Sequence, residues 1–208
     1  QDMDSGATLK EFLIWGTRAY PAERTMLALW DHGSGYYGYG GDENYPGEGK
    51  MMPLPAMAGA LQGFKAATGI TLDYIGFDAC LMATLEVAQA VQPYARYLGA
   101  SQELEPGSGW DWKSVIETAA RQPAPGLPEF GQIVATAFHD KQLRERPGDS
   151  PIPPLSDYVT FSIIDLARIG PLLERLEQWA RAVHAHYDSG AKRAHAGGGV
   201  FWPPTFAA

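Results

Sequence analysis

The sequence predicts an α/β fold in which helices cover both faces of a mostly parallel sheet. Short apolar runs alternate along the chain with longer amphipathic segments. Each of the first three apolar runs leads into residues that are polar or glycine, as is typical of parallel strands that end at a common edge. With 208 residues, of which 45% are hydrophobic, the chain can bury a sizeable core. We therefore expect one domain over residues 1–208.

The first elements follow from periodicity and from the residues that interrupt it. Residues 8–18 carry apolar side chains at helical spacing, and Pro21 ends this predicted helix. Residues 26–30 form a continuous apolar run, which is typical of a strand buried on both faces. Residues 35–49 are rich in glycine and tyrosine and predict a long loop. Residues 54–67 predict a second helix.

The middle of the chain repeats the same alternation. Residues 70–77 predict a second buried strand, and residues 81–91 predict the helix that follows it. Residues 94–100 predict a third strand. Two further helices are expected over residues 110–120 and 130–144.

The last third contains a proline-rich linker over residues 144–156. Residues 158–164 predict a fourth strand, because β-branched and aromatic residues dominate them. A long helix is expected over residues 166–186, and a short final strand over residues 200–202. Because the fourth strand reads as part of the same sheet, the linker does not divide the chain into domains.

Composition excludes several classes of protein. The formal charge is −8 and the pI is about 5.1, which argues against a nucleic-acid-binding surface. The apolar runs are shorter than the roughly 20 residues that a membrane helix needs. The one cysteine, Cys80, cannot form an internal disulfide or a zinc site with several cysteines.

Candidate catalytic residues follow the first two strands. His32 comes after the first strand, and Asp78 and Cys80 end the second. A lone cysteine and a histidine at the ends of buried strands are a candidate catalytic dyad. The alternative is that Cys80 is a small buried hydrophobic residue. The third strand is followed by Ser101, Gln102 and Glu103.

The chemistry of such a dyad explains why both residue types are needed. A free thiol is mostly protonated at neutral pH, and a nearby imidazolium or a helix N-terminus favours the reactive thiolate. The predicted helix after Cys80 would provide that N-terminus, and His32 could protonate the leaving amine. The backbone N–H groups of Gly33 and Cys80 could together form an oxyanion hole.

Three segments resemble blocks of the clostripain family of cysteine peptidases. They are Leu-Trp-Asp-His-Gly-Ser-Gly at 29–35, Asp-Tyr-Ile-Gly-Phe-Asp-Ala-Cys-Leu-Met-Ala at 73–83, and Ser-Gln-Glu-Leu-Glu-Pro-Gly-Ser-Gly-Trp at 101–110. The resemblance is dense over residues 4–112 and weaker over residues 157–203. His-Gly alone would be a weak motif, but the three blocks in this order are specific.

The resemblance implies a caspase-like three-layer α/β/α sandwich with a mostly parallel central sheet. It also implies an endopeptidase that needs no cofactor and cuts after arginine, in some cases lysine. The reaction would pass through a thioester acyl-enzyme. His32 would be the acid–base residue and Cys80 the nucleophile, and Gly33 and Cys80 would supply the oxyanion N–H groups.

Asp78 matches the family position for the acid at the floor of the pocket that binds the basic side chain. Its alternative role is to cap the helix expected after Cys80. Ser101, Gln102 and Glu103 would border the same pocket, and Glu105 is a candidate of the same standing as Glu103.

Further expectations concern partners, processing and metal. Relatives usually begin with a further strand and helix, so this chain either needs a companion N-terminal fragment or has been trimmed. Lys50, in the loop between the two catalytic blocks, suits self-cleavage after a basic residue. Because some relatives depend on calcium, Asp42 and Glu43 in the acidic loop are candidate ligands. Family precedent points to a secreted or cell-envelope bacterial protein.

Two other functions remain open at this stage. One is a catalytically silent caspase-like module that binds basic side chains in the same pocket. The other is a thiol hydrolase that acts on amides other than peptides. The presence of both dyad residues favours the peptidase, which takes a peptide or protein as its substrate.

Overall fold

The computed structural model describes residues 1–45, 51–121, 125–145 and 158–197. The chain divides into two compact units, one of residues 1–167 and one from residue 168 onward. The first unit contains the sheet and the candidate catalytic residues. The described part of the second unit consists mainly of helix α6 (Ile169–Gly197). The single domain expected over residues 1–208 stays a prediction.

A four-stranded sheet forms the centre of the first unit, in the order β1-β2-β3-β4. The first three strands are parallel, and β4 runs antiparallel to β3. The strands are β1 (Met26–Trp30), β2 (Leu72–Asp78), β3 (Ala95–Ala100) and β4 (Ser162–Asp165). The expected mostly parallel sheet is confirmed, and β4 occupies the end of the run expected over residues 158–164.

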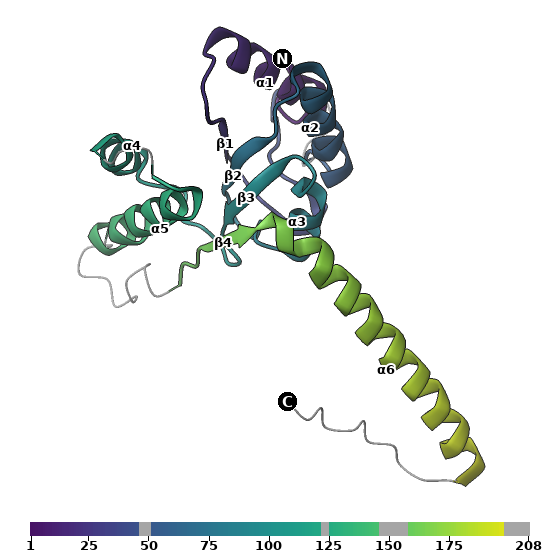
Figure 1. Ribbon diagram of the computed structural model, residues 1–208. Helices are drawn as coiled ribbons and strands as arrows, with labels where there is room; N and C mark the ends of the chain where they lie inside the picture. Colours follow the sequence, from purple (N-terminus) through teal and green to yellow (C-terminus); the bar gives the residue numbers. More distant parts are fainter. Residues whose placement is uncertain (46–50, 122–124, 146–157, 198–208) are drawn as a thin grey trace. The chain divides into compact units, whose positions relative to one another are not determined.

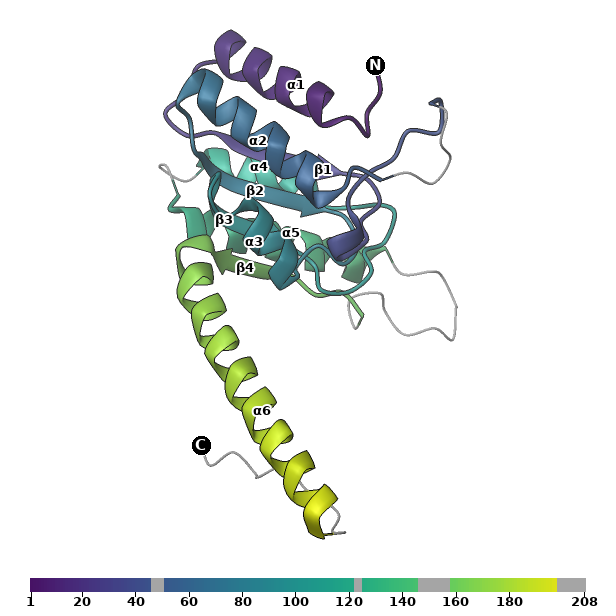
Figure 2. The ribbon, with the colours of Figure 1, turned by 90° about the vertical axis from the view of Figure 1, so that its right-hand side faces the viewer.

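Helices lie on both sides of this sheet, which confirms the three-layer α/β/α arrangement (Figure 1). One side holds α1 (Gly6–Ala19), α2 (Leu54–Thr68) and α3 (Leu85–Val91), and the other holds α4 (Trp112–Arg121) and α5 (Leu127–Arg144). Helix α1 lies alongside α2 (Figure 2). Short 3-10 turns occur at Gly35–Tyr37 and Leu166–Arg168.

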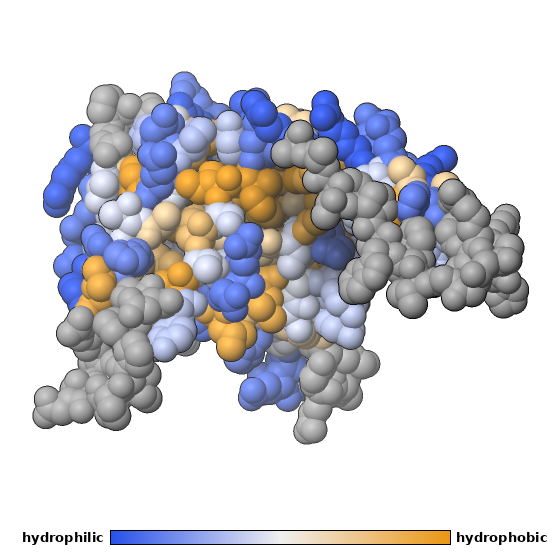
Figure 3. Space-filling view, turned by 90° about the horizontal axis from the view of Figure 1, so that it is seen from below, coloured by the Kyte–Doolittle hydropathy of each residue, from blue (hydrophilic) through white to orange (hydrophobic). Residues whose placement is uncertain are grey.

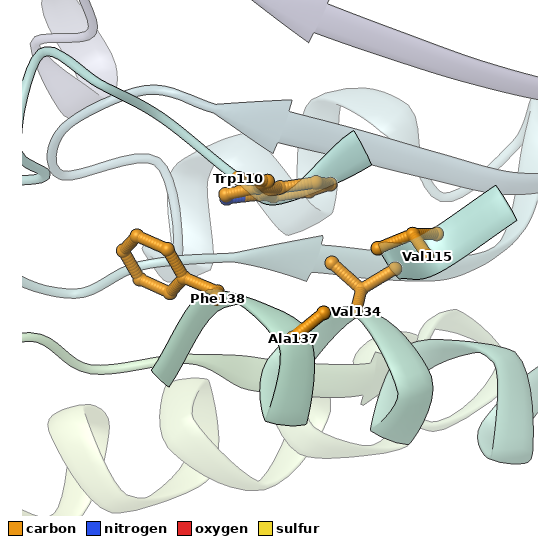
Figure 4. Packing of buried hydrophobic residues seen from close by; sticks show 5 residues of the cluster. All are labelled: Trp110, Val115, Val134, Ala137 and Phe138. Carbon is orange, nitrogen blue, oxygen red and sulfur yellow. The ribbon is translucent and has the colours of Figure 1, made fainter. Parts of the chain in front are cut away.

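The α4–α5 side carries a buried apolar cluster that fixes the segment after β3. Its members point toward one another between the two helices and the sheet: Trp110, Val115, Val134, Ala137 and Phe138 (Figure 4). Burying a large apolar side chain contributes roughly 1.5–3 kcal/mol. Because Trp110 is 2% exposed and comes just before α4, the cluster anchors one wall of the candidate site.

The expectation that the first strand is buried on both faces is wrong. Leu27 and Leu29 are buried, whereas Met26, Ala28 and Trp30 point to the other face and are exposed. Side chains alternate between the faces of a strand. In the described part of the chain, β1 is an edge strand and no helix covers its second face.

The helix expected over residues 81–91 begins later, at Leu85. Thr84 is its N-cap, and the Thr84 side chain accepts a hydrogen bond from the backbone of Val87. Leu81 has φ 63°, a left-handed conformation that cannot continue a right-handed helix. Cys80 therefore lies in a turn ahead of the helix rather than at its N-terminus.

Two of the expected features fall wholly or mostly outside the described residues. The final strand over residues 200–202 and most of the proline-rich linker are not among the described residues. None of the helices in the part of the chain that the structure describes has the length and apolarity needed to cross a membrane.

Candidate active site

Parallel pairing brings the two candidate catalytic segments together. Trp30 and Asp78 are register partners at the carboxyl ends of β1 and β2, so the residues after each strand emerge side by side. A cavity of about 420 Å³ opens there, and His32, Asp78 and Cys80 line it. The structure therefore unites the predicted dyad and the predicted pocket acid at one site, as the carboxyl edge of an open parallel sheet favours.

Gly33 is the point of closest approach between the two segments. A Cβ atom at Gly33 would lie 2.1 Å from the backbone oxygen of Cys80 and 2.8 Å from Cγ of Met82. No side chain fits in that space. Glycine at this position thus allows the histidine loop to pass directly against the cysteine turn.

The thiol of Cys80 is held by the backbone of Glu105. The Glu105 N–H donates to Sγ at 3.2 Å, and Sγ lies 3.7 Å from the Glu105 carbonyl oxygen, to which it can donate. His32 is exposed, and its backbone N–H donates to the Asp31 carboxylate. Cys80 thus lines the cavity while the Glu105 backbone holds its thiol.

Gly33 and Cys80 provide the N–H groups expected for an oxyanion hole. Within the described residues, the hydrogen bonds of this region use neither of these two N–H groups. The bonds on either side of Gly33 fix the loop, because Ser34 N–H donates to the Gly38 carbonyl and Gly40 N–H donates to the His32 carbonyl. The role of the Gly33 and Cys80 N–H groups in catalysis stays a prediction.

Asp78 is a buried carboxylate with donors built into the fold. It is 3% exposed, and the backbone N–H of Trp110 donates to both of its oxygens, at 3.1 and 3.0 Å. Nε1 of Trp112 donates to Oδ2 at 3.0 Å. Burial raises the pKa of Asp78, and these bonds act in the opposite direction. Its alternative role as a cap fails, because Thr84 caps the helix.

Glu105 is a second acid beside Asp78: both line the cavity, and the two carboxyl groups interact. Nε1 of Trp110 donates to Glu105 Oε2 at 3.1 Å, while Oε1 is buried and has no donor in the described part of the chain. Burial, and next the charge of Asp78, raise the pKa of Glu105 to about 9. Gly109, with φ 64°, lets the chain pass directly against Asp78, because a Cβ there would lie 2.8 Å from Asp78 Oδ1.

The structure separates the other predicted pocket residues from this cavity. Ser101 is buried, and its hydroxyl pairs with that of Thr160 at 3.0 Å. Gln102 is exposed, and Glu103 lines a neighbouring cavity of about 810 Å³. The backbone N–H groups of both residues donate to Thr160 Oγ1. None of the three is among the residues that line the cavity of His32 and Cys80.

Asp42, the first candidate calcium ligand, is already engaged by protein donors. Its carboxylate accepts bonds from the backbone N–H groups of Met3 and Asn44 and from the Asn44 side chain. These donors hold the pKa of Asp42 below its ordinary value. In the described ranges, no group of three or more His, Cys, Asp or Glu side chains is placed to hold a metal ion. Glu43 is described, whereas Lys50 lies outside the described residues.

Two pocket residues were missed or undervalued by sequence reasoning. Trp30 ends β1 with its indole 66% exposed and lines the cavity beside Asp78. The signal in the sequence was the position of Trp30 directly before Asp31 and His32. Apolar patterning instead assigns Trp30 to the core. The sequence did not distinguish Glu105 from Glu103, because both are acids in the same loop, two residues apart.

Comparisons with known proteins agree with this geometry. The model of the clostripain family matches residues 1–197. A search among curated proteins found no match.

Solved structures are similar as well. One is a secreted C11 cysteine protease from Bacteroides thetaiotaomicron in complex with an irreversible peptide inhibitor, at TM-score 0.63 and 21% identity, covering 83% of this chain and 48% of that chain. Another, from the same organism, is the secreted protease called iotapain, at TM-score 0.60 and 17% identity, covering 82% and 47%.

A third similar structure is an inactive zymogen C11 protease from Parabacteroides distasonis, at TM-score 0.56 and 23% identity, covering 81% of this chain and 42% of that chain. The chain thus spans about half the length of these structures. At these identities the solved structures show the shared fold, and the family model covers most of the chain. The chain belongs to the clostripain family of cysteine peptidases.

Proposed function

We propose that this chain carries the active site of a cysteine endopeptidase that cleaves peptide bonds after arginine, and in some cases lysine. The observation that carries the proposal is one cavity at the carboxyl edge of the sheet that holds His32, Cys80 and Asp78 together. Family membership supports the peptidase chemistry. The preference for a basic residue rests on the buried acid.

The reaction would follow thiol chemistry. Cys80 Sγ attacks the scissile carbonyl carbon while His32 takes the thiol proton, and the N–H groups of Gly33 and Cys80 stabilise the oxyanion. The C–N bond then breaks, His32 gives the proton to the leaving amine, and a thioester remains on Cys80. Water activated by His32 hydrolyses that thioester and restores the thiol. Substrate binding would have to free the sulfur from the Glu105 backbone.

Recognition of the basic side chain would use Asp78 and Trp30. A guanidinium binds a carboxylate through two N–H donors, and its planar face stacks on an indole. Asp78 and the exposed indole of Trp30 line the same cavity, so both contacts are available to one arginine. An ammonium group would use the carboxylate but stack less well.

A companion N-terminal fragment would complete the sheet. In the described part of the chain, β1 pairs only with β2, so its outer edge presents unpaired backbone groups. Large apolar side chains are exposed beside that edge, notably Met26 and Trp30. Hydrophobic residues also gather on another face, the one seen from below in Figure 3. Edges and apolar faces of this kind are ordinarily covered.

Three further parts of the proposal concern activation and location. Self-cleavage at Lys50 would separate the histidine loop from the cysteine turn in sequence but not in space. A calcium ion at Asp42 and Glu43 would have to displace the donors now bound to Asp42. Secretion is supported by two similar structures that are described as secreted proteases.

A panel of fluorogenic peptides tests the function. The panel has Arg, Lys, Ala, Leu or Asp before the scissile bond, and wild type runs beside Cys80→Ala and Asp78→Ala, with calcium and with chelator. We expect cleavage after Arg and Lys that disappears in Cys80→Ala, and loss of the basic preference in Asp78→Ala. Cleavage of non-peptide amides alone would indicate a different thiol hydrolase.

The thiol's bonds to Glu105 favour a second candidate, a silent module that binds basic side chains. An arginyl acyloxymethyl ketone separates the two functions. A peptidase becomes labelled at Cys80, whereas a silent module binds arginine peptides with the thiol unmodified. Absence of any cleavage or labelling, with the companion segment supplied, would leave the binding module as the function.

A further inference from the structure

Asp78 and Glu105, the two acids in the cavity, can hydrogen-bond to each other only when one of them is protonated. Glu105 Oε1 is buried without any donor among the described residues, Glu105 Oε2 accepts from Trp110 Nε1, and the Asp78 carboxylate lines the same cavity. Two carboxylates are both acceptors, so they can bond to each other only if one of them is protonated. Burial and the charge of Asp78 place that proton on Glu105, whose pKa rises to about 9.

With the proton in place, Asp78 has less capacity for a ligand. A carboxylate accepts about four hydrogen bonds. Trp110 N–H is shared by both oxygens and Trp112 Nε1 donates to Oδ2, so a protonated Glu105 would compete with a ligand for the acceptor positions that are left. A guanidinium that enters the cavity therefore competes with the Glu105 proton for these positions.

We propose that Glu105 is a specificity-determining residue, and that Asp78 and Glu105 hold one proton in the empty pocket and release it to solvent when an arginine side chain binds. This inference rests on the proposed function and names its recognition step. The charges balance: a pair with charge −1 becomes a pair with charge −2 that binds a guanidinium of charge +1. Both carboxylates then face the cation.

The surroundings of the pair are mixed in charge. The other titratable side chains that line the cavity or act on the pair are Asp31, His32, Tyr39, Cys80 and Lys141. Lys141, on α5, lowers the pKa of Asp78 and bonds the backbone oxygens of Ser108 and Trp110. Because several of these groups can titrate during catalysis, a test must cancel their contribution.

The ratio of the kcat/KM values of two substrates cancels the contribution of these other groups. Peptides with arginine or citrulline before the scissile bond differ only in that citrulline is neutral, so titration of His32 and Cys80 affects both alike. We expect the ratio of kcat/KM for the arginine peptide to that for the citrulline peptide to rise by up to about tenfold per pH unit below pH ~9, and to level off above it. The sign follows because the proton must leave before arginine binds.

Glu105→Gln is the decisive variant. Glutamine keeps the shape and can donate to Asp78, but it has no proton to release. We expect a lower arginine-to-citrulline ratio that no longer changes with pH. Glu11→Gln, the same change at an exposed position on α1, should keep the wild-type slope. An equal slope in wild type and Glu105→Gln overturns the inference.

Calorimetry gives a readout that does not need turnover. Benzoyl-arginine amide is titrated into Cys80→Ala protein in buffers of different ionisation enthalpy. We expect about one proton released per ligand bound near neutral pH, and none with Cys80→Ala/Glu105→Gln. Binding without proton release overturns the inference and leaves the basic pocket intact. If arginine binds no better than citrulline, the proposed function fails and the inference fails with it.

Discussion

The fold supplies hydrogen-bond donors to the buried carboxyl group of Asp78. Trp110 donates from the backbone and Trp112 from the indole, so the carboxylate is solvated by protein rather than by water. Removing such a charge from a binding pocket commonly costs about 2–4 kcal/mol of interaction with a cationic ligand. The preference for a basic residue should therefore depend strongly on the two oxygens of Asp78.

Asp78→Asn should lower kcat/KM for arginine peptides by about 1.5 to 3 orders of magnitude. Asparagine keeps the size of the side chain but removes the negative charge. Steady-state kinetics with arginine and alanine peptides measure the effect. If both substrates lose the same factor, Asp78 supports the fold of the site rather than the basic preference.

Trp30→Ala should reduce the preference for arginine over lysine. Loss of stacking on an indole costs about 1 kcal/mol, which is roughly fivefold in kcat/KM, and affects the planar guanidinium more than the ammonium. Because Trp30 is 66% exposed, folding should be little affected. Trp15→Ala, at a residue 57% exposed on α1, is the matched control and should leave the arginine-to-lysine ratio unchanged.

The raised pKa of Glu105, about 9 against an ordinary 4.5, predicts how stability changes with pH. Between these values the folded state holds a proton that the unfolded chain has lost. The free energy of unfolding should therefore fall as pH rises through this window. Urea unfolding at several pH values measures the fall, and Glu105→Gln should flatten it. A stability that rises over the same window in wild type but not in the variant would contradict the assignment.

The elements around the site are set by close backbone approaches as much as by helix and strand patterns. Gly33 passes against the Cys80 carbonyl, and Leu81 adopts the left-handed conformation that delays the next helix to Leu85. Both features shape the turn that carries Cys80, the proposed nucleophile. Neither is visible in a periodicity of 2 or 3.6 residues, because each depends on one dihedral angle or one contact.

Gly33→Ala should destabilise the protein by about 1–3 kcal/mol and abolish cleavage. The new Cβ would lie 2.1 Å from the Cys80 carbonyl oxygen, so one of the two catalytic segments must move. Chemical denaturation and peptide cleavage measure the two effects. Gly16→Ala is the control: a Cβ there meets nothing within 4 Å, and alanine in a helix should stabilise by about 0.5–1 kcal/mol. Full activity in Gly33→Ala would refute the close-contact argument.

At the scale of the whole molecule, β1 is an uncovered edge of the sheet in the described part of the chain. Its outer edge is unpaired in the described part of the chain, and one of its faces is exposed. An unpaired, apolar edge promotes association with other chains until a further strand covers it. The proposed companion fragment would meet this need.

Ala28→Lys tests that view. Ala28 lies in the middle of β1 on the exposed face, and a lysine there disfavours edge-to-edge association. Light scattering should show less self-association of the chain alone. With the companion fragment present, the same lysine should weaken its binding. No effect on either property would mean that this face stays exposed in the working protein.

The sequence alone determined the alternation of strands and helices, the residues that follow each strand, and the pairing of His32 with Cys80 as candidates. These features are local: apolar periodicity sets the elements, and polar residues at strand ends mark the edge where sites form. The family blocks added the role of Asp78. A sequence pattern of this kind needs no knowledge of which distant side chains meet.

Only the tertiary structure decided the rest. It placed Glu105 rather than Glu103 in the cavity, exposed Trp30 at the end of an apolar strand, and gave the cap of α3 to Thr84 instead of Asp78. Each outcome depends on which segments lie against each other. Burial, and with it the pKa of an acid or the exposure of an indole, is a property of the packed neighbours and not of the residue itself.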